Sequence, residues 1–84
     1  MTEEKRQVIR NWLNERKEIY EKYAKELNAE IHPFNPQIWV VPEDGEMKIL
    51  TQSKKRDTDA ALSLISNHSY YMGAKAALEG WGII

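Results

Sequence analysis

The sequence has no cysteine, and this absence removes several kinds of site at once. Disulfide bonds, thiolate metal ligands and cysteine nucleophiles all require that residue. Freedom from cysteine suits a reducing compartment, so we expect a cytoplasmic protein. No apolar run approaches the ~18 residues of a membrane span, and no apolar stretch follows a basic start as in a secretion signal.

An excess of charge of one sign is also missing. The chain has 84 residues, with 12 Lys plus Arg against 13 Asp plus Glu and a net charge of −1. The balance of charge therefore favours neither a strongly basic surface that binds nucleic acid nor an acidic protein that mimics it. A chain of this length buries only a little over ~60% of its unfolded surface, which leaves little room for a large enclosed active site. We expect a single domain over residues 1–84.

The sequence does contain two helical patterns. From Thr2 to about Asn28, apolar residues recur on one face at about 100° per residue and charges occupy the opposite face. Thr2 is a suitable N-cap for this helix. Asp57 or Thr58 is expected to cap a second helix that runs to about Glu79.

A β-hairpin signal lies between the two helical patterns. Two short apolar runs, 38–41 and 46–50, flank the turn sequence Pro42-Glu43-Asp44-Gly45, in which Pro fixes φ early and Gly accepts a positive φ late. A four-residue turn would place Val40 on an aliphatic face and Trp39 on the opposite face. A bulge at the glycine would invert the two faces.

These elements predict an α+β fold in the order α-β-β-α, with both helices packed on one face of the hairpin. Pro33 and Pro36 favour an extended connection before the hairpin, from which Ile31 and Phe34 are expected to cover the core. A two-stranded sheet is marginal alone and leaves two open edges, so dimerisation would extend it to a larger sheet or a helical interface.

The candidate partner-binding residues are Arg16, Trp39, Tyr70 and Trp81. Arg16 is the one charged residue in the middle of the first helix's apolar stripe, and periodicity does not place the three aromatic residues inside. Arg and large aromatic residues are enriched in the hot spots of protein interfaces. The alternative for Arg16 is a structural side chain paired with Glu79 or Asp57.

Small residues line one side of the second helix, in the spacing Ser69-x-x-x-Gly73-x-x-x-Ala77. Gly in a helix interior costs about 1 kcal/mol relative to Ala, so Gly73 indicates that something packs closely there. Self-association through these three residues is one interpretation. Packing by the first helix or the hairpin of the same chain is the other.

The basic cluster of the chain consists of Lys48, Lys54, Lys55 and Arg56. It supports an alternative function, that of a nucleic-acid-binding accessory protein, although Asp57 and Asp59 follow at once and the overall charge is not basic.

A third hypothesis is a small enzyme or metal protein that uses His68 and Glu79. No nucleophile, Gly-rich loop or ligand-spaced motif accompanies these two residues. We therefore expect no catalytic residue, no cofactor and no metal.

The function that the sequence favours is a non-enzymatic protein-interaction or assembly module, homo-oligomeric, that binds and occludes another protein. In its small size, balanced charge and lack of cysteine, the chain resembles the accessory and inhibitor proteins that phages and other mobile elements often encode. No single motif carries this resemblance, so it assigns no functional residue.

Overall fold

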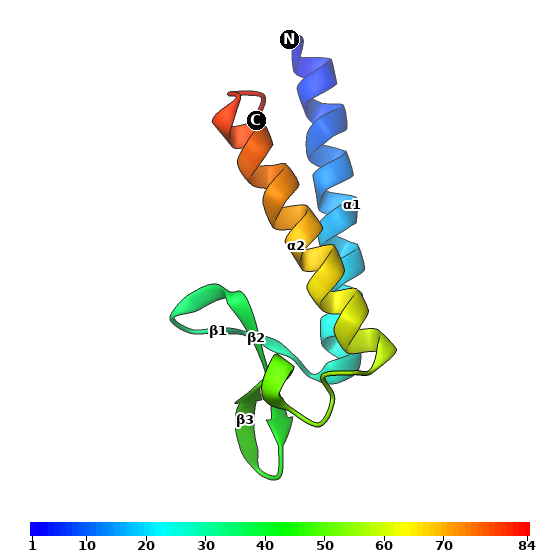
Figure 1. Ribbon diagram of the computed structural model, residues 1–84. Helices are drawn as coiled ribbons and strands as arrows, with labels where there is room; N and C mark the ends of the chain where they lie inside the picture. Colours follow the sequence, from blue (N-terminus) through cyan, green and yellow to red (C-terminus); the bar gives the residue numbers. More distant parts are fainter.

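A computed structural model describes all of residues 1–84. The elements are α1 (Glu3–Leu27), β1 (Glu30–His32), β2 (Asn35–Glu43), β3 (Glu46–Ile49), the 3₁₀ turn η1 (Leu50–Gln52) and α2 (Asp59–Gly80). The predicted α+β class is confirmed, with a three-stranded antiparallel sheet in the order β1-β2-β3. The two helices lie side by side, and the sheet packs at one end of the pair (Figure 1). The molecule is long and narrow, at 51 × 22 × 17 Å.

Both helices begin where the sequence predicts. The Thr2 hydroxyl accepts a hydrogen bond from the Lys5 backbone N–H at the start of α1, and Thr58 accepts one from the Ala61 N–H at the start of α2. α1 ends at Asn28, which adopts the left-handed conformation with φ of 53°. Asn tolerates this conformation better than most residues, which is why it serves as a C-cap. Neither helix has the combination of length and apolar character needed to cross a bilayer.

A third strand occupies the segment that was predicted to be an extended connection. β1 turns back at Pro33 and pairs antiparallel with the start of β2, with Ile31 opposite Trp39. The turn is held locally, because the His32 ring Nδ1 accepts from the Phe34 N–H. Phe34 stands at the tip of this arm and is 91% exposed, so the expectation that it covers the core is wrong. Pro33 lies in the turn itself, where its missing N–H removes no hydrogen bond from the strand pairing.

The predicted register of the second hairpin is also wrong. The turn has two residues rather than four, since Glu43 pairs with Glu46 and Val40 with Ile49. Asp44 and Gly45 both have positive φ, 53° and 80°. Two consecutive positive φ values are typical of the tight turn whose twist matches antiparallel strands, and Asp-Gly is a preferred sequence for it.

The core forms where the sheet meets the lower halves of the helices. Trp39 and Val41 from β2 pack with apolar side chains of both helices and with η1. The buried cluster consists of Tyr20, Ala24, Leu27, Trp39, Val41, Leu50, Ala61 and Leu64. Ser53 is also fully buried, and its hydroxyl donates to the Leu50 carbonyl at 2.8 Å. The inward face of the hairpin is therefore the one that carries Trp39, not its opposite.

Replacement of Val41 by Ala tests this core. Val41 has no exposed surface, and removal of its two methyl groups leaves a cavity, so we expect a loss of about 2–3 kcal/mol in the free energy of unfolding. Val8→Ala is the matched control, because Val8 is 66% exposed and Ala is the better helix former. Denaturant unfolding of the two variants measures the difference. Equal effects would contradict the placement of Val41 in the core.

Candidate functional site

A cluster of one cation and two aromatic rings joins α1 to α2. The Arg16 guanidinium carbon lies 4.6 Å from the centre of the Tyr70 ring. Its Nη2 donates to the Asn67 side-chain oxygen at 2.9 Å. The Trp12 ring meets Tyr70 edge-on, with 6.0 Å between ring centres. A cation over an aromatic face and an edge-to-face ring pair are both attractive arrangements.

The internal partners predicted for Arg16 are wrong. Glu79 pairs with Lys75 at 3.9 Å, and Asp57 pairs with Arg56 at 3.7 Å. The neutral Asn67 takes their place because it lies one turn before Tyr70 on the side of α2 that faces α1. The Asn67 amide nitrogen donates to the Ser63 carbonyl, and this fixes the amide that receives Arg16.

Exposed apolar side chains continue from this cluster along both helices. We call them the two-helix face, which consists of Val8, Trp12 and Ile19 of α1, Tyr70 of α2 and Trp81, the C-cap residue of α2. Within each helix the spacing of four, seven or eleven residues keeps the side chains on one side. Tyr70 is 54% exposed and Trp81 is 75% exposed. Exposed apolar side chains that gather on one side of a small protein are typical of interaction sites.

Trp39 does not belong to that surface, and its predicted exposure is wrong. It is only 7% exposed, and its ring lies edge-on to Tyr20 and to His68, with ring centres 6.0 Å and 5.1 Å away. The cause is the two-residue turn, which sets Trp39 on the helix side of β2 together with Val41. Of the predicted partner-binding residues, the structure brings Arg16 and Tyr70 together and places Trp81 farther along the same side of α2.

His68 is a core residue that packs between Tyr20 and Trp39. Its ring centre is 4.9 Å from that of Tyr20, and it is 6% exposed. Burial lowers the pKa of His68 and raises the pKa of Tyr20, because the charged form of each group loses solvation. His68 and Glu79 thus have separate surroundings, since the exposed Glu79 pairs with Lys75 near the C-terminal end of α2.

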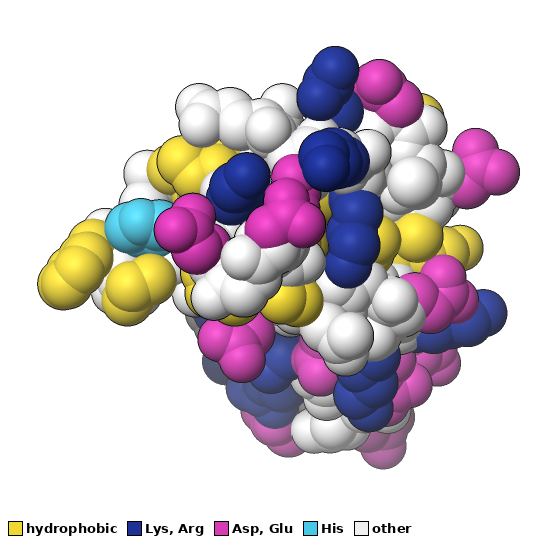
Figure 2. Space-filling model, turned by 90° about the horizontal axis from the view of Figure 1, so that it is seen from below, with side chains coloured by type: hydrophobic (Ala, Val, Ile, Leu, Met, Phe, Trp, Pro, Cys, Tyr) yellow, Lys and Arg dark blue, Asp and Glu magenta, His cyan; other side chains and the backbone are white.

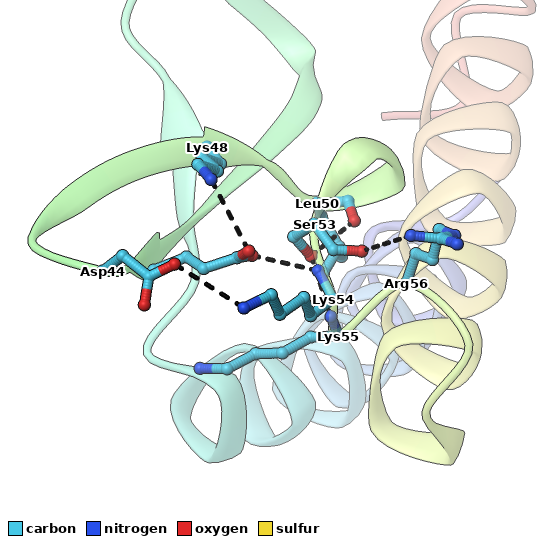
Figure 3. A network of polar contacts seen from close by, with 8 residues as sticks. Asp44, Lys48, Leu50, Ser53, Lys54, Lys55 and Arg56 are labelled. Carbon is cyan, nitrogen blue, oxygen red and sulfur yellow. Dashed lines mark hydrogen bonds and ion pairs between the residues drawn. The ribbon is translucent and has the colours of Figure 1, made fainter.

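The basic cluster forms part of an ion-pair network between the hairpin and the loop that precedes α2 (Figure 3). Lys48 lies 3.6 Å from the Glu43 carboxylate, and Lys54 lies 3.7 Å from that of Asp44. The Lys54 backbone N–H also donates to Glu43. This hydrogen bond, followed by the two lysine charges, holds the pKa of Glu43 below its ordinary value.

The remaining two members of the cluster contact backbone carbonyls. Lys55 donates to the Leu27 carbonyl at the end of α1, and Arg56 donates to the Ser53 carbonyl. Basic and acidic side chains interleave over this end of the molecule, and no uniform basic surface is seen there (Figure 2). The cluster therefore connects structural elements and has much of its charge compensated locally.

The small residues of α2 face away from the rest of the chain. Ser69 and Gly73 are exposed, and Ala77 is half-buried. A Cβ atom added at Gly73 would meet nothing within 4 Å. A hollow of about 470 Å³ lies beside Ser69 and Gly73, with Gln37 on its far wall. The interpretation that α1 or the hairpin packs on Gly73 is therefore wrong, and self-association stays a prediction.

No group of three or more His, Cys, Asp or Glu side chains lies close enough together to hold a metal ion. Comparison of the chain with protein-family models, with curated proteins and with solved structures gave no match. The site is therefore defined by its own geometry. Sequence reasoning did not single out Trp12 or Asn67 as site residues, because their contact with Tyr70 and Arg16 depends on how the two helices pack.

The burial of His68 predicts a dependence of stability on pH. Its pKa is lower in the folded chain than the ordinary 6.5, so acid protonates the unfolded state first. Stability is full above pH 6.5 and falls as the pH drops from there toward the lower folded pKa. Thermal unfolding of the wild type should show this loss as the pH is lowered through 6.5. His68→Phe should flatten the slope, while His32→Gln should retain it; a slope unchanged by His68→Phe would contradict the assignment.

The contacts of Glu43 also predict a stability that falls in acid. Here, however, the fold favours the charged form of the side chain. Its pKa is lower in the folded chain than the ordinary 4.5, so the ionised form stabilises the fold above that pH and the contribution disappears as acid protonates it. Glu43→Gln should therefore unfold at a lower temperature than the wild type at pH 7, and the two should converge in acid. Glu46→Gln, in the opposite strand and without an ion pair, is the control. A constant difference at all pH values would contradict the role of the charge.

Proposed function

We propose that the protein is a non-enzymatic interaction module that binds and occludes another protein through the two-helix face. The observation that carries this proposal is the arrangement of Trp12, Arg16 and Tyr70. Arg16 is fixed by Asn67 and by the Tyr70 ring, while the outer parts of both aromatic side chains stay in solvent. Trp, Tyr and Arg are the residues most enriched in interface hot spots.

The cluster is also preorganised. Binding normally costs about 0.5–1.5 kcal/mol for each flexible side chain that becomes fixed at an interface. Arg16 is held before any partner arrives, and Trp12 is supported edge-on by Tyr70. Fewer side chains then need to be fixed when a partner binds. The flanking Val8 and Ile19 add exposed apolar area beside this centre.

The shape favours occlusion as the mode of action. A narrow helix pair with one apolar side can cover a partner along its length without any enclosed site of its own. An accessory or inhibitor role in the cytoplasm is part of the proposal, and it requires no cofactor. Nucleic-acid binding has less support, because Lys48 and Lys54 face carboxylates and Lys55 and Arg56 contact the backbone.

Affinity capture followed by direct binding tests the proposal. The double variant Trp12→Ser/Tyr70→Ser should lose the partner, because truncation of aromatic hot spots costs about 2 kcal/mol or more, or roughly thirtyfold in Kd. Phe34→Ser is the matched control, since Phe34 is an exposed aromatic residue in the turn between β1 and β2, outside both helices. The affinity of the purified complex should change little with salt. Equal loss in the control, or binding only to nucleic acid with a steep salt dependence, would contradict the proposal.

A further inference from the structure

A second hollow lies where β2, β3, η1 and α2 meet, and it adjoins the hollow beside Gly73. Its volume is about 270 Å³. His68 and Ser69 of α2 line both hollows, and we call the second one the His68 pocket. Because residues of four elements surround it, the pocket is part of the fold and not a groove along one helix. Its apolar part is formed by three half-buried isoleucines, Ile38, Ile49 and Ile65.

His68 brings an unused polar group to this pocket. The side chain is only 6% exposed, and neither ring nitrogen has a hydrogen-bond partner within the chain. The ring nitrogens are nevertheless not among the fully enclosed atoms that lack a partner. The open edge of the ring therefore faces the hollows that His68 lines. Buried polar groups nearly always have a hydrogen-bond partner, so this edge is suited to receive one from a bound molecule.

Trp39, on the wall of the same pocket, has a similar deficit. It is 7% exposed, and its indole Nε1 has no hydrogen-bond partner. The Trp39 and His68 rings meet edge-on, with 5.1 Å between ring centres. Two neighbouring core residues thus retain hydrogen-bonding capacity that the chain itself does not use.

We infer that the His68 pocket binds a small uncharged aromatic molecule whose edge carries a hydrogen-bond donor beside an acceptor, as a primary amide does. No Asp, Glu, Lys or Arg lines the pocket, and burial of an unpaired charge is costly, so the ligand is uncharged. Isoleucine walls and the Trp39 ring favour a flat apolar body. The volume lies between the ~150 Å³ of a cavity that holds benzene and the ~300 Å³ at which pockets for drug-sized ligands begin. One or two rings therefore fit.

The polar groups of the pocket suit an edge that both donates and accepts. Burial lowers the pKa of His68 below the ordinary 6.5, so its ring is uncharged at neutral pH, with one nitrogen that donates and one that accepts. The Thr51 hydroxyl and the Gln52 amide, both on exposed residues of η1, add further donors and acceptors at the rim. The pocket uses no residue of the two-helix face, so this inference goes beyond the proposed function and can fail without it.

Titration of the ¹⁵N-labelled protein with benzamide, followed by NMR, tests the pocket. Benzamide has one ring and a primary amide, and benzoate has the same shape with a negative charge. We expect benzamide to shift the indole N–H signal of Trp39 saturably, with a Kd of roughly 1 mM or below, which is ordinary for so few atoms. The indole signal of the exposed Trp81 should not move. Benzoate should bind at least about tenfold more weakly, because the pocket offers no positive charge.

Two serine variants locate the binding. Ser66 and Ser69 are both exposed on α2, but only Ser69 lines the pocket. Ser69→Phe should abolish the saturable shift because its ring occupies the entrance, while the matched control Ser66→Phe should retain it. His68→Phe, which removes both ring nitrogens, should weaken benzamide by roughly three- to tenfold. No saturable shift at Trp39, equal binding of benzoate, or equal behaviour of the two serine variants would overturn the inference.

Discussion

The packing of Trp39 against Tyr20 and His68 is the contact on which the rest of the structure depends. It joins one residue from β2, one from α1 and one from α2, and all three are buried. Large aromatic side chains bury ~150–250 Å² each and dominate the stability of small cores. Val41 and Leu64 extend this contact into the single buried cluster of the chain. The position of the sheet follows from it.

Because that core sits at one end of the helix pair, the other end has no sheet to cover it (Figure 1). The helices cover each other along one stripe only, and their flanks remain open. On one flank the sequence places Trp12, Tyr70 and Trp81, which stay partly or largely exposed. On the outer side of α2 it places small uncharged residues. Both surfaces therefore result from the same constraint, which is a core too small to use all the apolar residues available.

The features that the sequence predicted correctly are those determined locally. The start of each helix depends on a side chain within three residues, and the sequence predicted Thr2 for α1 and either Asp57 or Thr58 for α2; the structure has Thr2 and Thr58. The hairpin register is also determined locally but was predicted wrongly, because it depends on which residues adopt positive φ. Asp44 and Gly45 both do, and this single difference moved Trp39 from the expected outer face to the core.

The features that were missed depend on contacts between distant parts of the chain. Strand β1 exists because Ile31 pairs with Trp39, and three residues flanked by proline give little local signal for a strand. The partner of Arg16 is Asn67, 51 positions away. The periodicity of α1 alone does not reveal such a contact, and the predicted partners were the charged residues Glu79 and Asp57. For the candidate site, Arg16, Tyr70 and Trp81 were predicted from their residue types, which are enriched in protein interfaces. Trp12 and Asn67 could be recognised as site residues only from the packing of the two helices. Trp39 could be excluded from the site only from the register of the hairpin.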